Sequence, residues 1–523
     1  MSERVVFESK NPAEFFLAFK ETAGLSNPQR VLYLSLRELI ENSLDACETI
    51  RRLPYVNSQI TRTVLNEFEI KCVDNGCGVP EKYIPRAFGQ LFYGSKYLLK
   101  QSRGLFGFGA KLVCLYGQTE TGRPLRVMSS TNGKVIHKFI LKTDITNNQP
   151  EVIQHQTIEN KNQWIGTGLA FHTKGDLRKA LPLIIDYLSE SNLINPYAVI
   201  NLKIEDKTIQ GEPILLNYAR IVNSMPMSPR AMLPHPSSIS RMQLVELLNN
   251  SSKNIMLKDF LRTHLHRVGR KTAEDFLEKM SIRDKNIQEI KTNEADIRIL
   301  HQALQTYPFS PPDIRYLSIL GEAPFTESVQ RKFNPSFISY SSKSSSYSGY
   351  PFAIEVVIGY LEQIPQGSDE ESFNLHRYCN RMPLITEYHD AIYKVLKGIN
   401  FKRYRFDDVR HLVFFVHLIS VKIPFKSQAK ESIAEVDEIM NKVELSLKEA
   451  LRNLSVKVSK RKRIQAQSKK WSIIKFYLGK LSQFTCESLD KPIISPNLIL
   501  QRYSTEIKKE EKDKIESGTI QHN

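Results

Sequence analysis

Apolar residues recur at helical spacing in two parts of the chain. In residues 28–45 they predict one buried face of a long helix, and Asn27-Pro28 favours a helix start there because proline is tolerated in a first turn. A second apolar face predicts a helix of about six turns from Lys430, which runs into the basic stretch Lys457–Lys470. The apolar positions are Val31, Leu32, Leu36, Leu39, Ile40 and Leu44 in the first helix and Ile433, Val436, Met440, Val443, Leu447, Leu451 and Leu454 in the second.

Alternation of apolar and polar residues predicts strands after the first helix. Residues 68–73 alternate and run into the turn Asp74-Asn75-Gly76. Similar runs occupy residues 125–128, 135–141 and 168–172. A helix and strands mixed over about 200 residues predict an α/β sandwich with helices on one face of a sheet.

Shifts in composition predict the organisation of the whole chain. Asn11-Pro12 favours a short capped helix, and the prolines and serines of residues 225–240 indicate a linker. Residues 242–306 have compact helical patterns, the serine run at 341–346 predicts a mobile loop, and the charged residues 503–523 predict disorder. The expected segments are an N-terminal arm (1–25), an α/β domain (26–225), a helical domain (226–306), a second α/β domain with the long helix (307–470) and a C-terminal segment (471–523).

The composition indicates a globular protein with a marked positive charge. Of its 523 residues 41% are hydrophobic and 25% charged, and no apolar run approaches the roughly 20 residues that span a bilayer. Because the N-terminus also lacks the apolar core of a signal peptide, we expect no membrane association and a cytoplasmic location. Six scattered cysteines favour neither a disulfide framework nor a zinc site. The net charge of +17 suits DNA as a partner, and lysine-rich surface helices are the alternative explanation.

The first predicted helix carries a polar face that suits a phosphate site. Glu38, Asn42 and Asp45 follow at i, i+4 and i+7, so they share one side of the helix. The carboxylate of Glu38 can polarise a water for attack on a γ-phosphate, and Asn42 offers Mg²⁺ a neutral oxygen. On its own, this pattern is more often the solvated face of an amphipathic helix.

A second motif, Asp74-Asn75-Gly76-Cys77-Gly78, follows the first predicted strand. A carboxylate at a strand end can accept the amino proton of adenine, and Gly76 and Gly78 allow a flat base to approach the backbone. Alone, Asp-Asn-Gly is a common turn.

A third, glycine-rich segment precedes an apolar helix. Its glycines place successive backbone N–H groups at a helix N-terminus, which favours an anion cradle to which Lys111 adds charge. No Gly-x-x-x-x-Gly-Lys-Ser/Thr is present, so the segment is not a P-loop. The glycines also suit a lid that orders over a triphosphate, and a flexible turn is the alternative. The segment consists of Gly104, Leu105, Phe106, Gly107, Phe108, Gly109, Ala110 and Lys111.

In this order and within one domain, the three motifs resemble those of the GHKL ATPases, the group of gyrase, MutL, histidine kinases and a heat-shock chaperone. The resemblance implies the Bergerat fold with ATP and Mg²⁺ bound. It makes Glu38 the general base, Asn42 the metal ligand and Asp74 the adenine contact. Gly166-Thr167-Gly168 matches a fourth motif and puts Thr167 near the adenine. The remaining implied nucleotide-binding residues are Asp45, Gly76, Gly78 and the whole glycine-rich segment 104–111.

Over its full length the chain is similar to the B subunits of archaeal DNA topoisomerase VI. Phe92–Tyr97 matches the family, except that Gly94 stands where serine is frequent, and the match adds Ser95 and Lys96 to the implied nucleotide site. Residues 242–306 resemble its helix-two-turn-helix insert.

The later part of the chain resembles the transducer domain of the same family. Residues 377–384 match a stretch of that domain, and residues 422–434 match the region that holds a switch lysine. In the family this lysine reaches the γ-phosphate from the second domain. We assign this role to Lys422, with Lys426 as the alternative.

The resemblance implies the ATP-operated gate of a type IIB topoisomerase. Two copies close on ATP and trap a DNA segment, while a separate A subunit cleaves DNA within an A₂B₂ heterotetramer. The expected partners are the A subunit, double-stranded DNA and a second copy of the chain. The long helix and the segment after Trp471 form the expected docking surface. The alternatives are another GHKL ATPase that acts on DNA, such as a MutL-like protein, and a non-catalytic DNA-binding scaffold.

Overall fold

The computed structural model describes most of the chain between residues 11 and 501. The described residues are 11–18, 25, 27–94, 98–104, 107, 109–206, 208, 211–252, 254–364, 373–426, 430–489, 492–495, 497–498 and 500–501. Two compact units divide the chain, one up to Arg452 and one from Asn453. Outside the described residues lie the expected site residues Ser95, Lys96, Leu105, Phe106 and Phe108, residues 1–10 of the expected arm, and residues 503–523.

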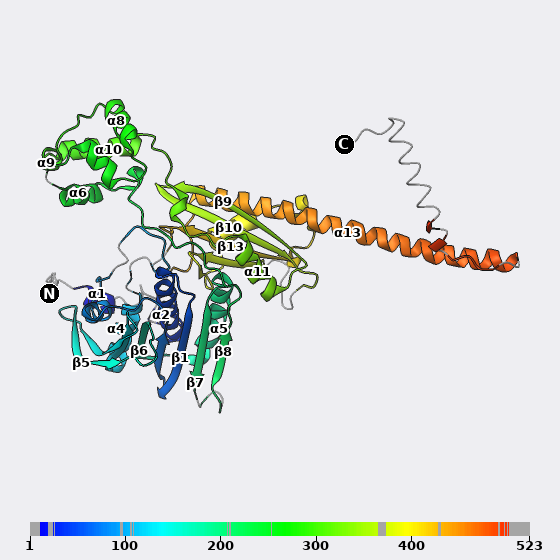
Figure 1. Cartoon of the computed structure of the whole chain (residues 1–523), viewed down its shortest axis with the longest axis horizontal. Coiled ribbons are helices and arrows are strands. Elements are labelled where there is room, and N and C mark those ends of the chain that lie inside the picture. Colours follow the sequence, from blue (N-terminus) through cyan, green and yellow to red (C-terminus); the bar gives the residue numbers. More distant parts are fainter. Residues whose placement is uncertain are drawn as a thin grey trace, which may run out of the picture. The chain divides into compact units, whose positions relative to one another are not determined.

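Eight of the described strands form the first sheet, in the order β5-β4-β3-β6-β2-β1-β7-β8 (Figure 1). Neighbouring strands are antiparallel except β1 and β7, which are parallel. The strands are β1 Tyr55–Val64, β2 Glu67–Val73, β3 Leu125–Ser130, β4 Val135–Asp144, β5 Gln149–Glu159, β6 Gly166–Lys174, β7 Val199–Glu205 and β8 Ile214–Tyr218. The strands predicted near residues 68, 125, 135 and 168 are therefore present.

The helix α2 (Pro28–Thr49) is the central cover of this sheet. It packs against α4 (Gly109–Thr121), α5 (Leu177–Ile194) and β6, so the three helices share one face, as the α/β pattern predicted (Figure 1). The side chain of Asn27 accepts a hydrogen bond from the N–H of Gln29 at 2.9 Å and caps α2. The six apolar residues that predicted this helix are all buried. Shorter helices nearby are α1 Pro12–Ala18, η2 Glu81–Tyr83 and α3 Ile84–Gly89.

A helical insert follows the linker, as expected for residues 242–306. Its short helices enclose a core of their own, in which Phe260 and Phe276 are fully buried. They are η3 Pro236–Ser238, α6 Arg241–Asn250, α7 Leu257–His264, α8 Arg270–Lys279, α9 Ile287–Thr292 and α10 Glu294–Thr306.

A second sheet has the described strand order β12-β11-β13-β10-β9. Its strands β10 and β13 are buried along almost their whole length, and β11 runs parallel to β13. The elements of this part are η4 Ile314–Tyr316, α11 Glu322–Phe333, β9 Phe337–Tyr347, β10 Tyr350–Tyr360, β11 Asn374–Cys379, β12 Met382–Pro383, α12 Ala391–Lys397, η5 Phe401–Tyr404, η6 Val409–His411 and β13 Leu412–Ser420.

The prediction of a mobile loop at residues 341–346 is wrong. These serines lie inside β9, which pairs with β10 without interruption from Phe337 opposite Tyr360 to Tyr347 opposite Tyr350. A buried strand such as β10 must satisfy its backbone groups on both edges, and this requirement outweighs the weak strand preference of serine.

The prediction that the long helix begins at Lys430 is also wrong. Residue 430 has a left-handed backbone with φ of 56°, and Ile433 forms an isolated β-bridge with Phe425. The helix, α13, begins at Asp437 and continues to Ser488, through and beyond the basic stretch. Among the residues that the structure describes, no helix is both long and apolar enough to cross a membrane.

Candidate functional site

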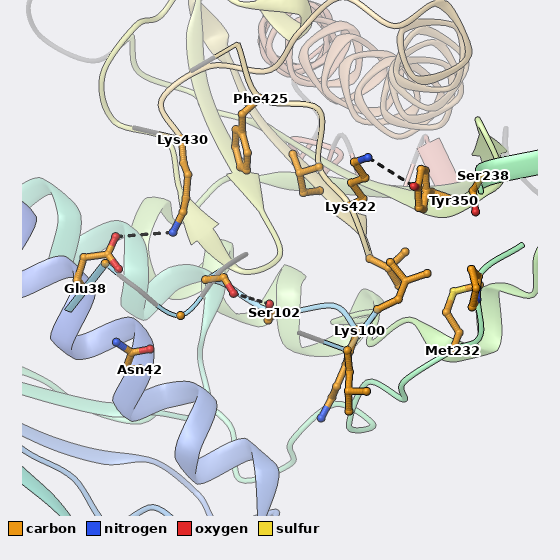
Figure 2. Close-up of a pocket in the computed structure, with 18 of the residues that line it drawn as sticks. Glu38, Asn42, Lys100, Ser102, Met232, Ser238, Tyr350, Lys422, Phe425 and Lys430 are labelled. Atoms are coloured by element: carbon orange, nitrogen blue, oxygen red, sulfur yellow. Dashed lines mark hydrogen bonds and ion pairs between the residues drawn. The ribbon is translucent and has the colours of Figure 1, made fainter. Parts of the chain in front are cut away.

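Glu38 and Asn42 lie one turn apart on α2 and both face a cavity of about 1020 Å³ (Figure 2). The structure therefore brings the first and third motifs together, because residues of the glycine-rich segment line the same cavity. Lysines from the segment between β13 and α13 complete its wall. The expected residues among its lining are Glu38, Asn42, Gly104, Gly107, Gly109, Lys422 and Lys426.

The carboxylate of Glu38 is held from several directions. One oxygen lies 3.3 Å from Nη2 of Arg37 and 3.7 Å from Nζ of Lys430. The other points at the start of α4, where a Cβ on residue 109 would lie only 1.9 Å from it. Glycine at position 109 therefore allows the carboxylate to reach the N-terminus of this helix.

The second and fourth motifs meet at Asp74. Its Oδ1 accepts hydrogen bonds from the N–H groups of Gly76 at 2.8 Å and Thr167 at 3.1 Å, and its Oδ2 accepts one from Ser43 Oγ at 3.2 Å. Burial raises the pKa of the Asp74 carboxyl to about 6, although these hydrogen bonds act in the opposite direction. Gly78 has φ of 69°, so this turn needs a residue that tolerates the left-handed region. Asp74 and Thr167 are not among the described residues that line the cavity.

Two expected nucleotide contacts bind other protein groups. The carboxylate of Asp45 accepts a hydrogen bond from Nη1 of Arg103 at 2.7 Å. Lys111 donates to the carbonyl oxygens of Gln90, at 2.9 Å, and Tyr93. Burial lowers the pKa of Lys111 to about 8. The half-buried Ala110 stands between Gly109 and Lys111 in the first turn of α4.

Besides Lys100, three lysines from the segment between β13 and α13 line the cavity. Two of them, Lys422 and Lys430, point to different groups (Figure 2). Nζ of Lys422 lies 3.4 Å from the hydroxyl of Tyr350 and 4.8 Å from the centre of its ring. Lys426 is exposed. Lys430 points to Glu38, and its Nζ also donates to the carbonyl oxygen of Arg103 at 3.5 Å.

Sequence reasoning did not single out Lys430. It stands in the same matching stretch as the other two lysines, four residues after Lys426, so composition and spacing do not separate the three. Lys430 lies near Glu38 of α2 because of two local features of the backbone. One is its own left-handed conformation, and the other is the β-bridge between Phe425 and Ile433. No local pattern in the sequence predicts this left-handed backbone or this β-bridge.

Known proteins resemble the chain along nearly its whole length. A family model described as topoisomerase VI B subunit, transducer, matches residues 312–470. A second, described as histidine kinase-, DNA gyrase B-, and HSP90-like ATPase, matches residues 32–167. A solved structure, the crystal structure of the N-terminal domain of a DNA repair protein, has a TM-score of 0.41 at 13% identity and covers 81% of this chain and 94% of its own. A TM-score and a sequence identity this low carry no argument about the function of this chain.

Curated relatives identify the family. The B subunit of type 2 DNA topoisomerase 6 from Saccharolobus solfataricus is 35% identical over 491 residues, which cover 92% of this chain and 91% of that protein. The proteins of the same name from Saccharolobus islandicus and Saccharolobus shibatae are 35% identical over 516 residues, covering 97% of this chain and 94% of each relative. The mixed α/β fold, with an ATPase domain and a transducer domain, agrees with the expectation from the sequence. The chain belongs to the family of type 2 DNA topoisomerase 6 B subunits.

Proposed function

We propose that this chain is the ATP-operated gate of a type IIB DNA topoisomerase, and that nucleotide binding joins two copies around a DNA segment. One observation carries the proposal. Lys430, from the segment before α13, lies 3.7 Å from Glu38 on α2, so the phosphate end of the cavity is built by two domains. A triphosphate that contacts both domains binds one mutual arrangement more tightly and shifts the equilibrium toward it.

The proposed chemistry starts with a water between Glu38 and the γ-phosphate. Glu38 takes its proton while the oxygen attacks phosphorus and the bond to the ADP oxygen breaks. A lysine from the second domain neutralises charge on the γ-phosphate. The contacts favour Lys430 for this role over Lys422, whose Nζ lies against Tyr350, and Lys426 stays a second choice on the cavity wall.

The other site residues take the roles that their positions suit. Asp74 and Thr167 contact the adenine, and the N–H groups of the glycine-rich segment donate hydrogen bonds to the phosphates. The half-buried Asn42 offers a hard oxygen donor to the cavity and fits Mg²⁺, which supplies charge neutralisation on the triphosphate when bound. Asp45 acts through Arg103.

We infer a topoisomerase A subunit and double-stranded DNA as partners, in an A₂B₂ complex that works in the cytoplasm. The end of α13 exposes a dense set of apolar side chains, which suits a docking surface for the A subunit. The basic stretch Lys457–Lys470 before it, whose lysines and arginines are all exposed, suits DNA phosphates. The exposed apolar residues are Trp471, Ile473, Ile474, Phe476, Tyr477, Leu481 and Phe484.

The mass of the full chain in solution tests this proposal. Light scattering with Mg²⁺ and a non-hydrolysable ATP analogue should show a dimer, and the same protein without nucleotide a monomer. The variant Asp74→Asn, which loses the carboxylate for adenine, should stay monomeric at the same analogue concentration. If the nucleotide binds but the mass of the chain does not change, the proposed ATP-driven dimerisation is wrong. That result would favour the alternative of a non-catalytic DNA-binding scaffold.

A further inference from the structure

The residues that lead into the glycine-rich segment are attached to the second domain. Gln101 and Ser318 exchange two hydrogen bonds, from Gln101 Nε2 to the Ser318 carbonyl at 3.2 Å and from the Ser318 N–H to Gln101 Oε1 at 2.6 Å. The carbonyl of Ser102 accepts a hydrogen bond from Nδ2 of Asn380 at 3.0 Å. The Ser102 hydroxyl donates to the carbonyl of Gly104 at 2.8 Å (Figure 2). Ser102 therefore links Asn380 to the first glycine of the segment.

Arg103 connects the same segment to α2 and to a second arginine. Its Nη1 donates to Asp45, and its Nη2 donates to Oε1 of Glu48 at 2.6 Å. The other oxygen of Glu48 accepts a hydrogen bond from Nη2 of Arg381 at 2.7 Å. Arg103, Glu48 and Arg381 are all buried, so the carboxylate is shared by two arginines away from solvent. Charges placed in this way hold a fixed geometry because each loses its hydration and depends on its partners.

Asn380 and Arg381 form the turn between β11 and β12, and both have left-handed backbones, with φ of 49° and 63°. The turn is fixed to β13. Asn380 exchanges hydrogen bonds with the backbone of Ser420, at 2.9 and 3.0 Å, two residues before Lys422. The N–H of Arg381 donates to Nε2 of His417 at 3.0 Å.

His417 extends this connection into the centre of the second sheet. Its Nε2 accepts a hydrogen bond, so the ring proton is on Nδ1, which donates to Oε2 of Glu355 at 2.9 Å. Burial lowers the pKa of His417, in agreement with this neutral form. The carboxylate of Glu355 also accepts hydrogen bonds from the N–H groups of Leu320 and Gly321, just before α11. One chain of buried contacts thus runs from Arg103 to the sheet centre.

We propose that the Asn380–Arg381 turn is a positioning element that sets where the glycine-rich segment begins relative to Glu38. When the second domain changes its position, the turn carries residues 102–103 with it. The phosphate end of the site is then assembled or disturbed independently of Lys430. This inference rests on the proposed ATP hydrolysis at Glu38. Asn380 and Arg381 are positioning residues, since they contact Ser102 and Glu48 and lie outside the described lining of the cavity.

The test compares ATP binding with ATP turnover in the full-length chain. Asn380→Asp removes the donor to the carbonyls of Ser102 and Ser420 while keeping the size of the side chain. Arg381→Lys keeps the positive charge but loses the planar guanidinium group. A matched control is Glu190→Gln. Glu190 of α5 contacts His376 of β11 at 3.1 Å and Lys332 of α11 at 2.6 Å, so it joins the same two domains away from the glycine-rich segment.

The expected result is a split between catalysis and binding. For both turn variants kcat for ATP should fall by about tenfold or more, because a small misplacement of reacting groups is costly. The Kd of a fluorescent ATP analogue should change by less than about threefold, and the melting temperature of each folded variant should match that of the control. Glu190→Gln should keep kcat within about twofold of the unaltered chain.

Two results would overturn the inference. One is an unchanged kcat in a folded turn variant, and the other is an equal fall of kcat in Glu190→Gln, which would mean that any loss of interdomain contact has the same effect. If one turn variant does not fold, the other decides. If the unaltered chain binds ATP without hydrolysing it, the proposed function fails; if it hydrolyses ATP as fast as the turn variants do, only this inference fails.

Discussion

At the scale of single residues, the site depends on the orientation of the Glu38 carboxylate. Glu38 is 9% exposed and is held between Arg37 and Lys430, with its second oxygen against the start of α4. Such a group has few rotamers to choose from, so it meets a bound phosphate in a defined orientation. Orientation of this kind is a large part of what a general base contributes.

Replacing this carboxylate should separate turnover from binding. In Glu38→Gln the side chain keeps its size but cannot accept the proton of water, so kcat for ATP should fall by about 10²- to 10⁴-fold. The Kd of ATP should change by less than about threefold, because the adenine and phosphate contacts stay in place. Phosphate release and analogue binding measure the two quantities. Persistent turnover would show that another group is the base.

Asp74 should make nucleotide affinity depend on pH. Its pKa is raised to about 6, so the carboxyl is ionised at pH 7.5 and becomes protonated as the pH falls through 6. Only the ionised form gives adenine a charged acceptor, so the Kd of ATP should rise as the pH falls from 7.5 to about 5.5. The Kd of Asp74→Asn should be higher and should vary less over the same range, with the titration of the phosphates common to both. Parallel pH profiles of the two proteins would contradict the role of Asp74 as adenine contact.

At the scale of elements, the segment between β13 and α13 decides which lysine meets the site. Lys422, Lys426 and Lys430 are evenly spaced in the sequence, yet they differ in what they reach because the described residues of this segment, 421–426 and 430–436, are not helical. Its geometry comes from the strand β13 before it and from the bridge between Phe425 and Ile433. One substitution on each of two lysines distinguishes their roles.

Lys430→Met should lower kcat for ATP by about 10²- to 10³-fold, the scale of losing one preorganised charge at a reacting phosphate. Lys422→Met, which removes a lysine that lies on Tyr350, serves as the matched variant and should lower it by less than about tenfold. Steady-state ATP turnover of both variants at saturating ATP is the measurement. The reverse ranking would return the switch role to Lys422.

Local sequence signals predicted α2 and the motifs that it presents. The apolar face of α2, its Asn27 cap and the glycines near Gly109 are short-range features, so the helix and its polar face could be predicted from them. The Bergerat fold was implied only by the resemblance of the motifs to the GHKL ATPases. The strand at residues 341–346 could not be predicted locally, because it forms by pairing with the buried strand β10, whose backbone groups need hydrogen-bond partners. The position of Lys430 and the contact between Arg381 and Glu48 depend on residues far away in the chain, which no local pattern encodes.

At the scale of the whole molecule, the net charge of +17 is partly concentrated in one helix. Within α13, the stretch Lys457–Lys470 carries seven exposed lysines and arginines, and its own sequence contains no aspartate or glutamate. A helix of this kind binds phosphates without reading sequence. Its contribution is therefore best measured through salt dependence.

Neutralising part of this stretch should weaken DNA binding and flatten its response to salt. With Lys460, Arg461, Lys462 and Arg463 all changed to Gln, the slope of log affinity against log salt for double-stranded DNA should decrease by up to about 4. Fluorescence anisotropy at several salt concentrations measures this slope. A control changes four exposed lysines in and around the first sheet, Lys71, Lys138, Lys161 and Lys203, and should leave the slope closer to that of the unaltered chain. Equal slopes in the two variants would mean that only total charge matters.

The buried contact between Glu48 and Arg381 has a consequence for how the protein is made. The two residues are 333 positions apart, so at about 5–20 residues per second a ribosome adds Arg381 about 17 to 67 s after Glu48. Even after its last motif, at residues 166–168, has been added, the nascent ATPase domain lacks the turn that we propose positions its glycine-rich segment. If the turn acts as proposed, we expect an unfinished chain to hydrolyse ATP slowly until this part of the second domain has been synthesised.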